Sequence, residues 1–95
     1  MICRNLRVNG RRTSLRMEQE IWDAVDDVAR RRCILVTELV SEIDRQRGEA
    51  SLTAELRVYV LGYYRKVIER LDSYGMTRVP LARPIEQPAE YATLQ

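Results

Sequence analysis

The segment RRTSLRM, residues 11–17, decides the fold, because polar and apolar side chains alternate along it. Alternation with a period of two is typical of a β-strand that has one buried and one exposed face. The face expected to be buried carries Thr13, Leu15 and Met17. The opposite, polar face carries Arg12, Ser14 and Arg16. The sequence therefore predicts one short strand near the N-terminus.

A single strand needs partners for its backbone N–H and C=O groups, and the sequence offers two arrangements. Asn9-Gly10 is a favourable two-residue turn, which would pair residues 6–8 with residues 11–13 inside one chain. Alternatively, residues 11–17 pair with the same strand of a second copy about a twofold axis. We favour the second arrangement, an intersubunit antiparallel ribbon in a homodimer, because residues 6–8 make a short partner.

The polar face of the strand suits contact with double-stranded DNA. The major groove admits a two-stranded β-ribbon, from which Arg can bond guanine O6 and N7 and Ser can bond any base. We therefore expect Arg12, Ser14 and Arg16 to read bases, and Arg7 and Arg11 to contact phosphates. A merely solvated polar face is the alternative interpretation.

The distribution of charge favours the same partner. Residues 1–17 contain five Arg and no acidic residue, whereas residues 18–95 carry a net charge of −3. A basic segment attached to a mildly acidic body indicates a polyanionic partner.

Length and composition exclude several classes of protein. A chain of 95 residues fits one small domain with a modest core, which oligomerisation would help to stabilise.

The absence of histidine excludes a Ser-His-Asp triad and a His-based metal site. Cys3 and Cys33 predict neither a disulfide framework nor a zinc site, which is typical of the reducing cytoplasm. We thus expect no catalytic residue, no metal and no cofactor. No apolar run is long enough to cross a bilayer, so no membrane contact is expected.

Apolar residues recur at helical spacing in the middle of the chain. They predict helices over residues 19–32 and 36–47, and a third helix that begins near Ser51 or Thr53. Residues 72–95 contain all three prolines and predict an irregular tail. The expected organisation is a basic arm (1–10), a mainly α domain with one strand and three helices (11–71), and a Pro-containing tail (72–95).

Apolar side chains on the strand and the first two helices are expected to form the core of the dimer. They are Thr13, Leu15, Met17, Trp22, Val25, Leu39, Val40 and Ile43. Tyr59, Tyr63 and Tyr64 fit a packed helix face better than a surface for stacking bases. Arg30, Arg31 and Arg32 either stabilise the end of their helix or contact phosphates.

The run RRTSLRMEQEIWDAV (residues 11–25) resembles the ribbon-helix-helix family, as do ARR (29–31), LVSEID (39–44) and RGEA (47–50). The stretch LRVYVLGYYR (56–65) is similar to the extra third helix of the bacterial branch of that family. The resemblance extends over about residues 8–66. It implies an obligate dimer whose intersubunit ribbon enters the major groove, usually to repress transcription.

The resemblance also implies a second contact with DNA, at the N-terminus of the second helix, where backbone N–H groups bind a phosphate. This corner maps to Leu35, Val36 and Thr37. The family usually places Gly at the preceding turn and Ser or Thr at the helix cap. Here Cys33 and Leu35 hold those two positions.

The C-terminal tail leaves a second hypothesis open. Residues 76–95 are either a disordered end or a segment that folds on a protein partner, as the tail of an antitoxin does. In the second case the protein is an interaction module, which binds its partner through the tail or the third helix.

Overall fold

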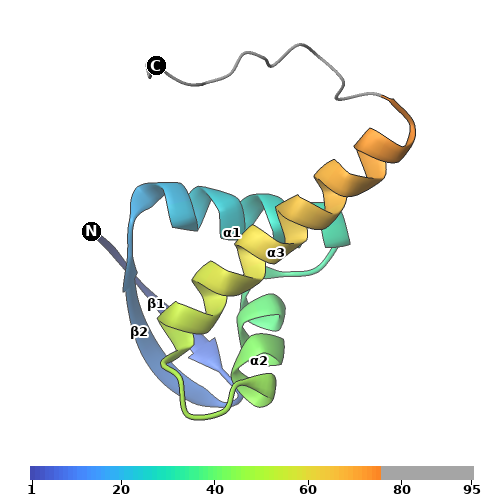
Figure 1. Cartoon of the computed structure of the whole chain (residues 1–95). Helices are drawn as coiled ribbons and strands as arrows, with labels where there is room; N and C mark the ends of the chain where they lie inside the picture. The colour runs from blue at the N-terminus through green and yellow to red at the C-terminus, as the bar shows by residue number, and fades with distance from the viewer. Residues whose placement is uncertain (76–95) are drawn as a thin grey trace, which may run out of the picture. The chain divides into compact units, whose positions relative to one another are not determined.

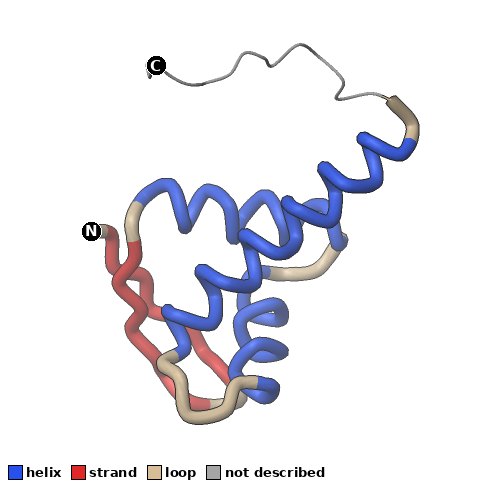
Figure 2. The backbone as a smooth tube through the Cα atoms, viewed as in Figure 1, coloured by secondary structure: helices blue, strands red, loops and turns tan. Residues whose placement is uncertain are grey.

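The computed structural model describes residues 1–75. A β-hairpin precedes three helices (Figures 1 and 2), and the elements are β1 (Ile2–Val8), β2 (Arg11–Met17), α1 (Gln19–Arg32), α2 (Val36–Gln46) and α3 (Leu52–Ser73). The chain divides into two compact units with a boundary after Tyr64, and the contacts described below lie within residues 1–64. The predicted tail segment, residues 76–95, lies outside the described residues. The mainly α fold class, with an N-terminal sheet and three helices, is confirmed.

The two strands pair antiparallel through the turn Asn9-Gly10, and Ile2 pairs with Met17 at the open end of the hairpin. Both turn residues have positive φ, 49° and 84°, as a type I′ turn requires and as Asn and Gly adopt most readily. Of the two arrangements considered for β2, the hairpin within one chain is present, and the favoured pairing across a dimer stays a prediction. The partner strand has seven residues, whereas the sequence pattern predicted one strand, with residues 6–8 as the partner available within the chain.

The alternation of β1 is hidden in the sequence because a charged residue occupies one of its inward positions. Val8 is completely buried and Leu6 packs against the core. Arg4 lies on the same side, with its guanidinium 4.4 Å from the centre of the Trp22 ring, and donates hydrogen bonds of 2.8 and 2.9 Å to Asp26. The segment therefore lacks the simple apolar pattern that identifies β2.

One apolar core lies between the inner side of the hairpin and the helices. Among the described residues it consists of Val8, Leu15, Met17, Trp22, Val25, Val28, Ala29, Leu39, Val40, Ile43, Leu52, Leu56 and Val60. Seven of the eight residues predicted for a dimer core are buried here by their own chain, and Thr13 is half-buried. The core is thus closed without a second copy, and a part in dimerisation stays a prediction for these residues.

The helix boundaries follow local sequence chemistry. The residue after α1, Cys33, is left-handed, with φ 59° and ψ 40°, a conformation that glycine usually supplies at the end of a helix. Ser51 Oγ accepts the N–H of Ala54 at 3.2 Å and caps α3. The predicted starts of the second and third helices are therefore confirmed at Val36 and Leu52.

Candidate nucleic-acid interface

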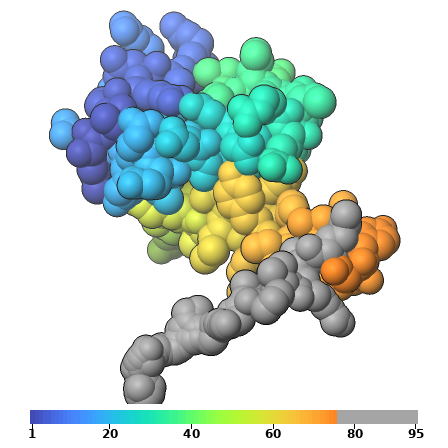
Figure 3. All heavy atoms as spheres, turned by 90° about the horizontal axis from the view of Figure 1, so that it is seen from above, coloured from blue at the N-terminus to red at the C-terminus, as the bar shows by residue number. Residues whose placement is uncertain are grey.

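The exposed side of the hairpin carries three pairs of side chains that face each other across the strands. The register places opposite each other Cys3 and Arg16, Asn5 and Ser14, and Arg7 and Arg12, and all six are exposed. We call this surface, made of Cys3, Asn5, Arg7, Arg12, Ser14 and Arg16, the ribbon face. Figure 3 shows the hairpin residues, in blue, at the surface of the first unit. The three residues of β2 that were expected to read bases share this face, and β1 adds three more.

The N-terminal arginines fall into two groups. Arg4 and Arg11 each reach a carboxylate of the helices, Asp26 at 2.8 Å and Asp44 at 3.3 Å. Arg7, Arg12 and Arg16 have no carboxylate partner among the described residues, and all three lie on the ribbon face. The positive charge that the sequence places in its first 17 residues is therefore left uncompensated mainly on one surface.

At its open end, the hairpin is attached to α1. The Trp22 indole N–H donates to the carbonyl oxygen of Ile2 at 2.9 Å, next to the Arg4–Asp26 pair. Hydrogen bonds from the guanidinium lower the pKa of Asp26 below its usual value, against an opposing effect of burial. These contacts fix β1 on the body of the domain and thereby fix the outward direction of the ribbon face.

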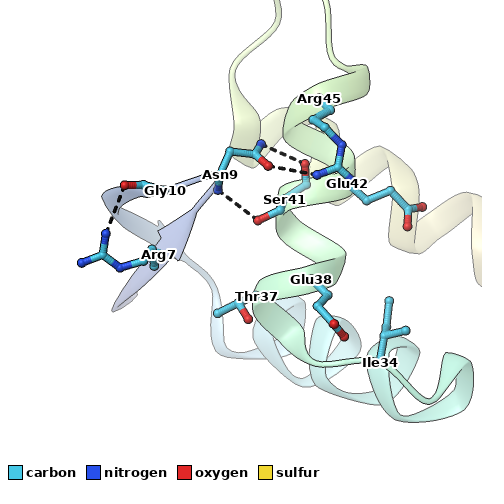
Figure 4. A pocket seen from close by; sticks show the side chains of 9 residues that line it. All are labelled: Arg7, Asn9, Gly10, Ile34, Thr37, Glu38, Ser41, Glu42 and Arg45. Carbon is cyan, nitrogen blue, oxygen red and sulfur yellow. Dashed lines mark hydrogen bonds between the residues drawn. The ribbon is translucent and has the colours of Figure 1, made fainter.

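The turn end of the hairpin is attached to α2 through Asn9 (Figure 4). The backbone N–H of Asn9 donates to Ser41 Oγ at 3.2 Å, and its amide nitrogen donates to the Ser41 carbonyl at 3.1 Å and to Asp44 at 2.9 Å. Its amide oxygen accepts from Arg45 at 2.9 Å. Asp44 also binds Arg47, and these bonds lower its pKa. Arg11, which was expected to contact a phosphate, pairs with the same carboxylate at the longer distance of 3.3 Å, and its side chain remains 67% exposed.

An open groove lies between the hairpin turn and one side of α2, from Thr37 to Arg45, and Figure 4 shows Thr37 and Glu38 along it. Glu38 accepts the backbone N–H of Leu35 at 2.8 Å, while the Leu35 side chain has no acceptor for a reciprocal bond. The N–H groups of Val36 and Thr37 belong to the first helical turn, which has no intrahelical partners for them. Cys33 adopts the left-handed conformation that glycine usually provides at the end of a helix, so the turn before α2 keeps this conformation without a glycine.

The remaining candidates bind partners within α1 or on a neighbouring helix and do not belong to the ribbon face. Arg30 and Arg31 pair with Asp27 at 2.6 and 2.8 Å. Tyr64 donates to Asp27 at 2.6 Å, and burial together with this bond raises the pKa of Tyr64 to about 12. Arg32 pairs with Glu42 and donates to the Tyr59 hydroxyl. These bonds favour a packing role for the tyrosines and a structural role for the three arginines.

Asn5 belongs to this surface although the sequence pattern did not predict it. Extending the register outward from the Asn9-Gly10 turn by one residue on each strand at a time would have placed it opposite Ser14. The information was present in the turn, but the inward Arg4 made the segment look like a basic arm.

A two-stranded ribbon with an exposed basic face, held on three helices, defines a class of small ribbon-and-helix domains. The chain belongs to the ribbon-helix-helix family, because the model of the ribbon-helix-helix domain matches residues 1–64. Members of this family are typically DNA-binding transcription regulators or antitoxins. No curated protein and no solved structure matches the chain. Among the described residues, none of the helices combines the length and the apolar character needed to cross a membrane.

Proposed function

We propose that this protein is a homodimeric, sequence-specific DNA-binding regulator of transcription that acts as a repressor. One observation carries the proposal: Arg12, Ser14 and Arg16 share the exposed face of β2, and the two arginines have no carboxylate partner among the described residues. Guanidinium groups free of carboxylates can bond guanine O6 and N7 bidentately in the major groove. The hydroxyl group between them adds a second kind of contact to bases.

The proposed dimer forms through the second edge of β2, since β1 occupies only its first edge and no other described strand pairs with it. Pairing with β2 of a second copy gives the order β1-β2-β2-β1 about a twofold axis. The outer strands are then about 14 Å apart at about 4.8 Å per strand spacing, slightly more than the roughly 12 Å width of the major groove. The two central strands enter the groove in this arrangement, and β1 lies at its margins.

The margins of the groove are where phosphates lie, which suits the remaining basic groups. Arg7 faces outward on β1, and Arg11 is largely exposed beside the turn. We assign phosphate contacts to these two arginines and to the backbone N–H groups of Val36 and Thr37. The Leu35 N–H, the third contact expected at this corner, already donates to Glu38. Glu38 lies at the same helix end, and its negative charge weakens the helix contact relative to the arginines.

Binding of labelled duplexes, selected by the wild-type protein from random DNA, tests the proposal. We expect log affinity to fall with log salt by about 0.9 for each phosphate neutralised. Replacing Arg12, Ser14 and Arg16 together with Ala should remove the preference for the selected duplex over a scrambled one. A matched control also removes two arginines and one serine, from α3, as Arg65→Ala, Arg70→Ala and Ser73→Ala, and should keep the preference. A ribbon variant that keeps its preference would refute the proposal.

A second candidate function is a protein-interaction module of the antitoxin type. Its support is an apolar stretch of α3, where Val58 and Leu61 are 66% and 61% exposed. Under this alternative, Leu61→Asp abolishes binding of a protein partner and leaves DNA binding unchanged, while Arg65→Asp on the same helix changes neither. Deletion of residues 76–95 tests in the same way whether the tail contributes to that partner's binding.

A further inference from the structure

The centre of the ribbon face is polar but uncharged. Asn5 on β1 and Ser14 on β2 are direct cross-strand partners, and such partners have Cβ atoms about 5 Å apart. The pairs on either side contribute Arg7 and Arg12 toward the turn and Arg16 toward the open end. Two neutral hydrogen-bonding side chains therefore lie between the cationic positions of the surface.

The hydrogen bond between these two side chains decides what each can still offer a ligand. Ser14 Oγ donates its only proton to Asn5 Oδ1 at 2.5 Å, which leaves the Ser14 oxygen as an acceptor. The Asn5 amide nitrogen has two hydrogens and no acceptor among the described residues. Asn9 differs from Asn5, because its amide is fully used by Ser41, Asp44 and Arg45. Asn5 and Ser14 together thus present a free donor beside a free acceptor.

Adenine has the complementary pattern in the major groove, because its N7 accepts and its N6 amino group donates. Guanine presents two acceptors, N7 and O6, and O6 would face the Ser14 oxygen with no proton between them. Cytosine itself offers only an amino donor, so adenine alone carries an acceptor and a donor on the major-groove edge of a single base. We propose that Asn5 and Ser14 recognise adenine as a unit and that Asn5 is a specificity-determining residue of the ribbon face.

This inference rests on the proposed function and adds to it a preference that β2 alone does not specify. A serine with a freely rotating hydroxyl bonds any base, whereas a serine that donates to Asn5 can only accept. Arg12 and Arg16 would read guanines on either side, so each half-site contains an A·T pair between positions that favour G·C. Although β1 lies at the margin of the groove, the Asn5 side chain reaches Ser14 on β2. The strand β1 then acts in two ways, through Arg7 at the phosphates and through Asn5 at a base.

The test uses the full chain and the duplex that the wild-type protein selects from random DNA. Competition binding compares this duplex with versions in which single A·T pairs are replaced by G·C. The variants are Asn5→Ala, Ser14→Ala, their double variant, and Asn5→Asp, which keeps the acceptor for Ser14 but removes the amide donors. Gln46→Ala removes an exposed amide from α2 and serves as the matched control. Thermal unfolding verifies that each variant is folded.

We expect the wild-type protein to prefer A·T at one position of each half-site by about 5- to 150-fold, the discrimination of a good bidentate contact. Asn5→Ala and Asn5→Asp should each lose most of that preference at the same position, and the double variant should lose no more than Asn5→Ala. Ser14→Ala should lose only part of it, because the freed Asn5 oxygen can then accept from adenine N6. Preferences for guanine at the neighbouring positions should persist. If the wild-type protein selects a sequence and Asn5→Ala selects the same one, the inference is wrong and the proposed function stands. If the wild-type protein selects no sequence, both are wrong.

Discussion

Replacing Val8 with Ala tests whether the N-terminal segment is a structural strand or only a basic arm. Val8 is completely buried and belongs to the apolar core, next to the turn that Asn9 attaches to α2. The substitution removes two buried carbon groups, worth about 0.8 kcal/mol each in transfer free energy. An additional cost of the cavity left behind brings the expected loss to about 2 kcal/mol.

Equilibrium unfolding in urea, at one fixed protomer concentration, measures this loss as a change in the free energy of unfolding. Val58→Ala is the matched control, because it makes the same chemical change at a position of α3 that is 66% exposed. Its effect should stay within about 0.5 kcal/mol. If Val8→Ala were no more destabilising than Val58→Ala, β1 would not be packed on the body, and the ribbon face would lose the strand that carries Asn5.

Three further predictions concern local chemistry. Cys33→Gly should stabilise the protein by about 0.5–1 kcal/mol in the same assay, because relief of the left-handed conformation exceeds the added entropy of the unfolded chain. Arg4 lowers the pKa of Asp26 in the folded state, so the pair stabilises the fold above the unfolded pKa of about 3.9 and loses this effect as the pH falls through the folded pKa. Asp26→Asn should therefore destabilise the protein at pH 7 but have little effect in strong acid, and equal effects at both would contradict this. Ultraviolet titration should detect a tyrosine with a pKa of about 12 in the wild-type protein and no such tyrosine in Tyr64→Phe. Because a tyrosine in the unfolded chain has a pKa of about 10, the stability that Tyr64 contributes is lost as the pH rises from about 10 to about 12.

Periodicity was sufficient to predict β2 and the three helices, because apolar side chains recur at regular spacing along one face of each. Trp22 and Val25 on α1, and Leu39 and Ile43 on α2, are spaced so that one side of each helix is apolar, and all four are buried. Such patterns depend on burial alone and can be read without knowledge of the neighbouring elements.

The hairpin partner could not be predicted from periodicity, because its inward Arg4 is satisfied only by groups distant in sequence. Trp22 and Asp26 lie about 20 positions away along the chain, and their contact with Arg4 depends on the assembled fold. The same limit applies to Asn5, whose position opposite Ser14 follows from the register of a strand that the pattern did not reveal. The candidate site was thus predicted on β2 and missed on β1.

The N-terminus of α2 shows a different limit of prediction from sequence. The sequence indicated that Cys33 and Leu35 depart from the usual residues of this corner, but the backbone keeps a left-handed turn at Cys33. The cap residue Leu35 has no side-chain acceptor, and the capping bond is instead made by the Glu38 side chain, which accepts the backbone N–H of Leu35. Local backbone geometry can therefore persist when its usual residues are absent, at a modest cost in strain.

The central claim, that the ribbon face is the surface that contacts DNA, is tested most directly by nuclear magnetic resonance of the guanidinium Nε–H groups. Each arginine gives its own signal, so a titration with the selected duplex reports on Arg7, Arg12 and Arg16 separately from Arg4, which is already held by Asp26. We predict large changes for the three arginines of the ribbon face and small changes for Arg4 and for Arg65 on α3. Changes confined to arginines of the helices, with the ribbon-face signals unmoved, would contradict the account.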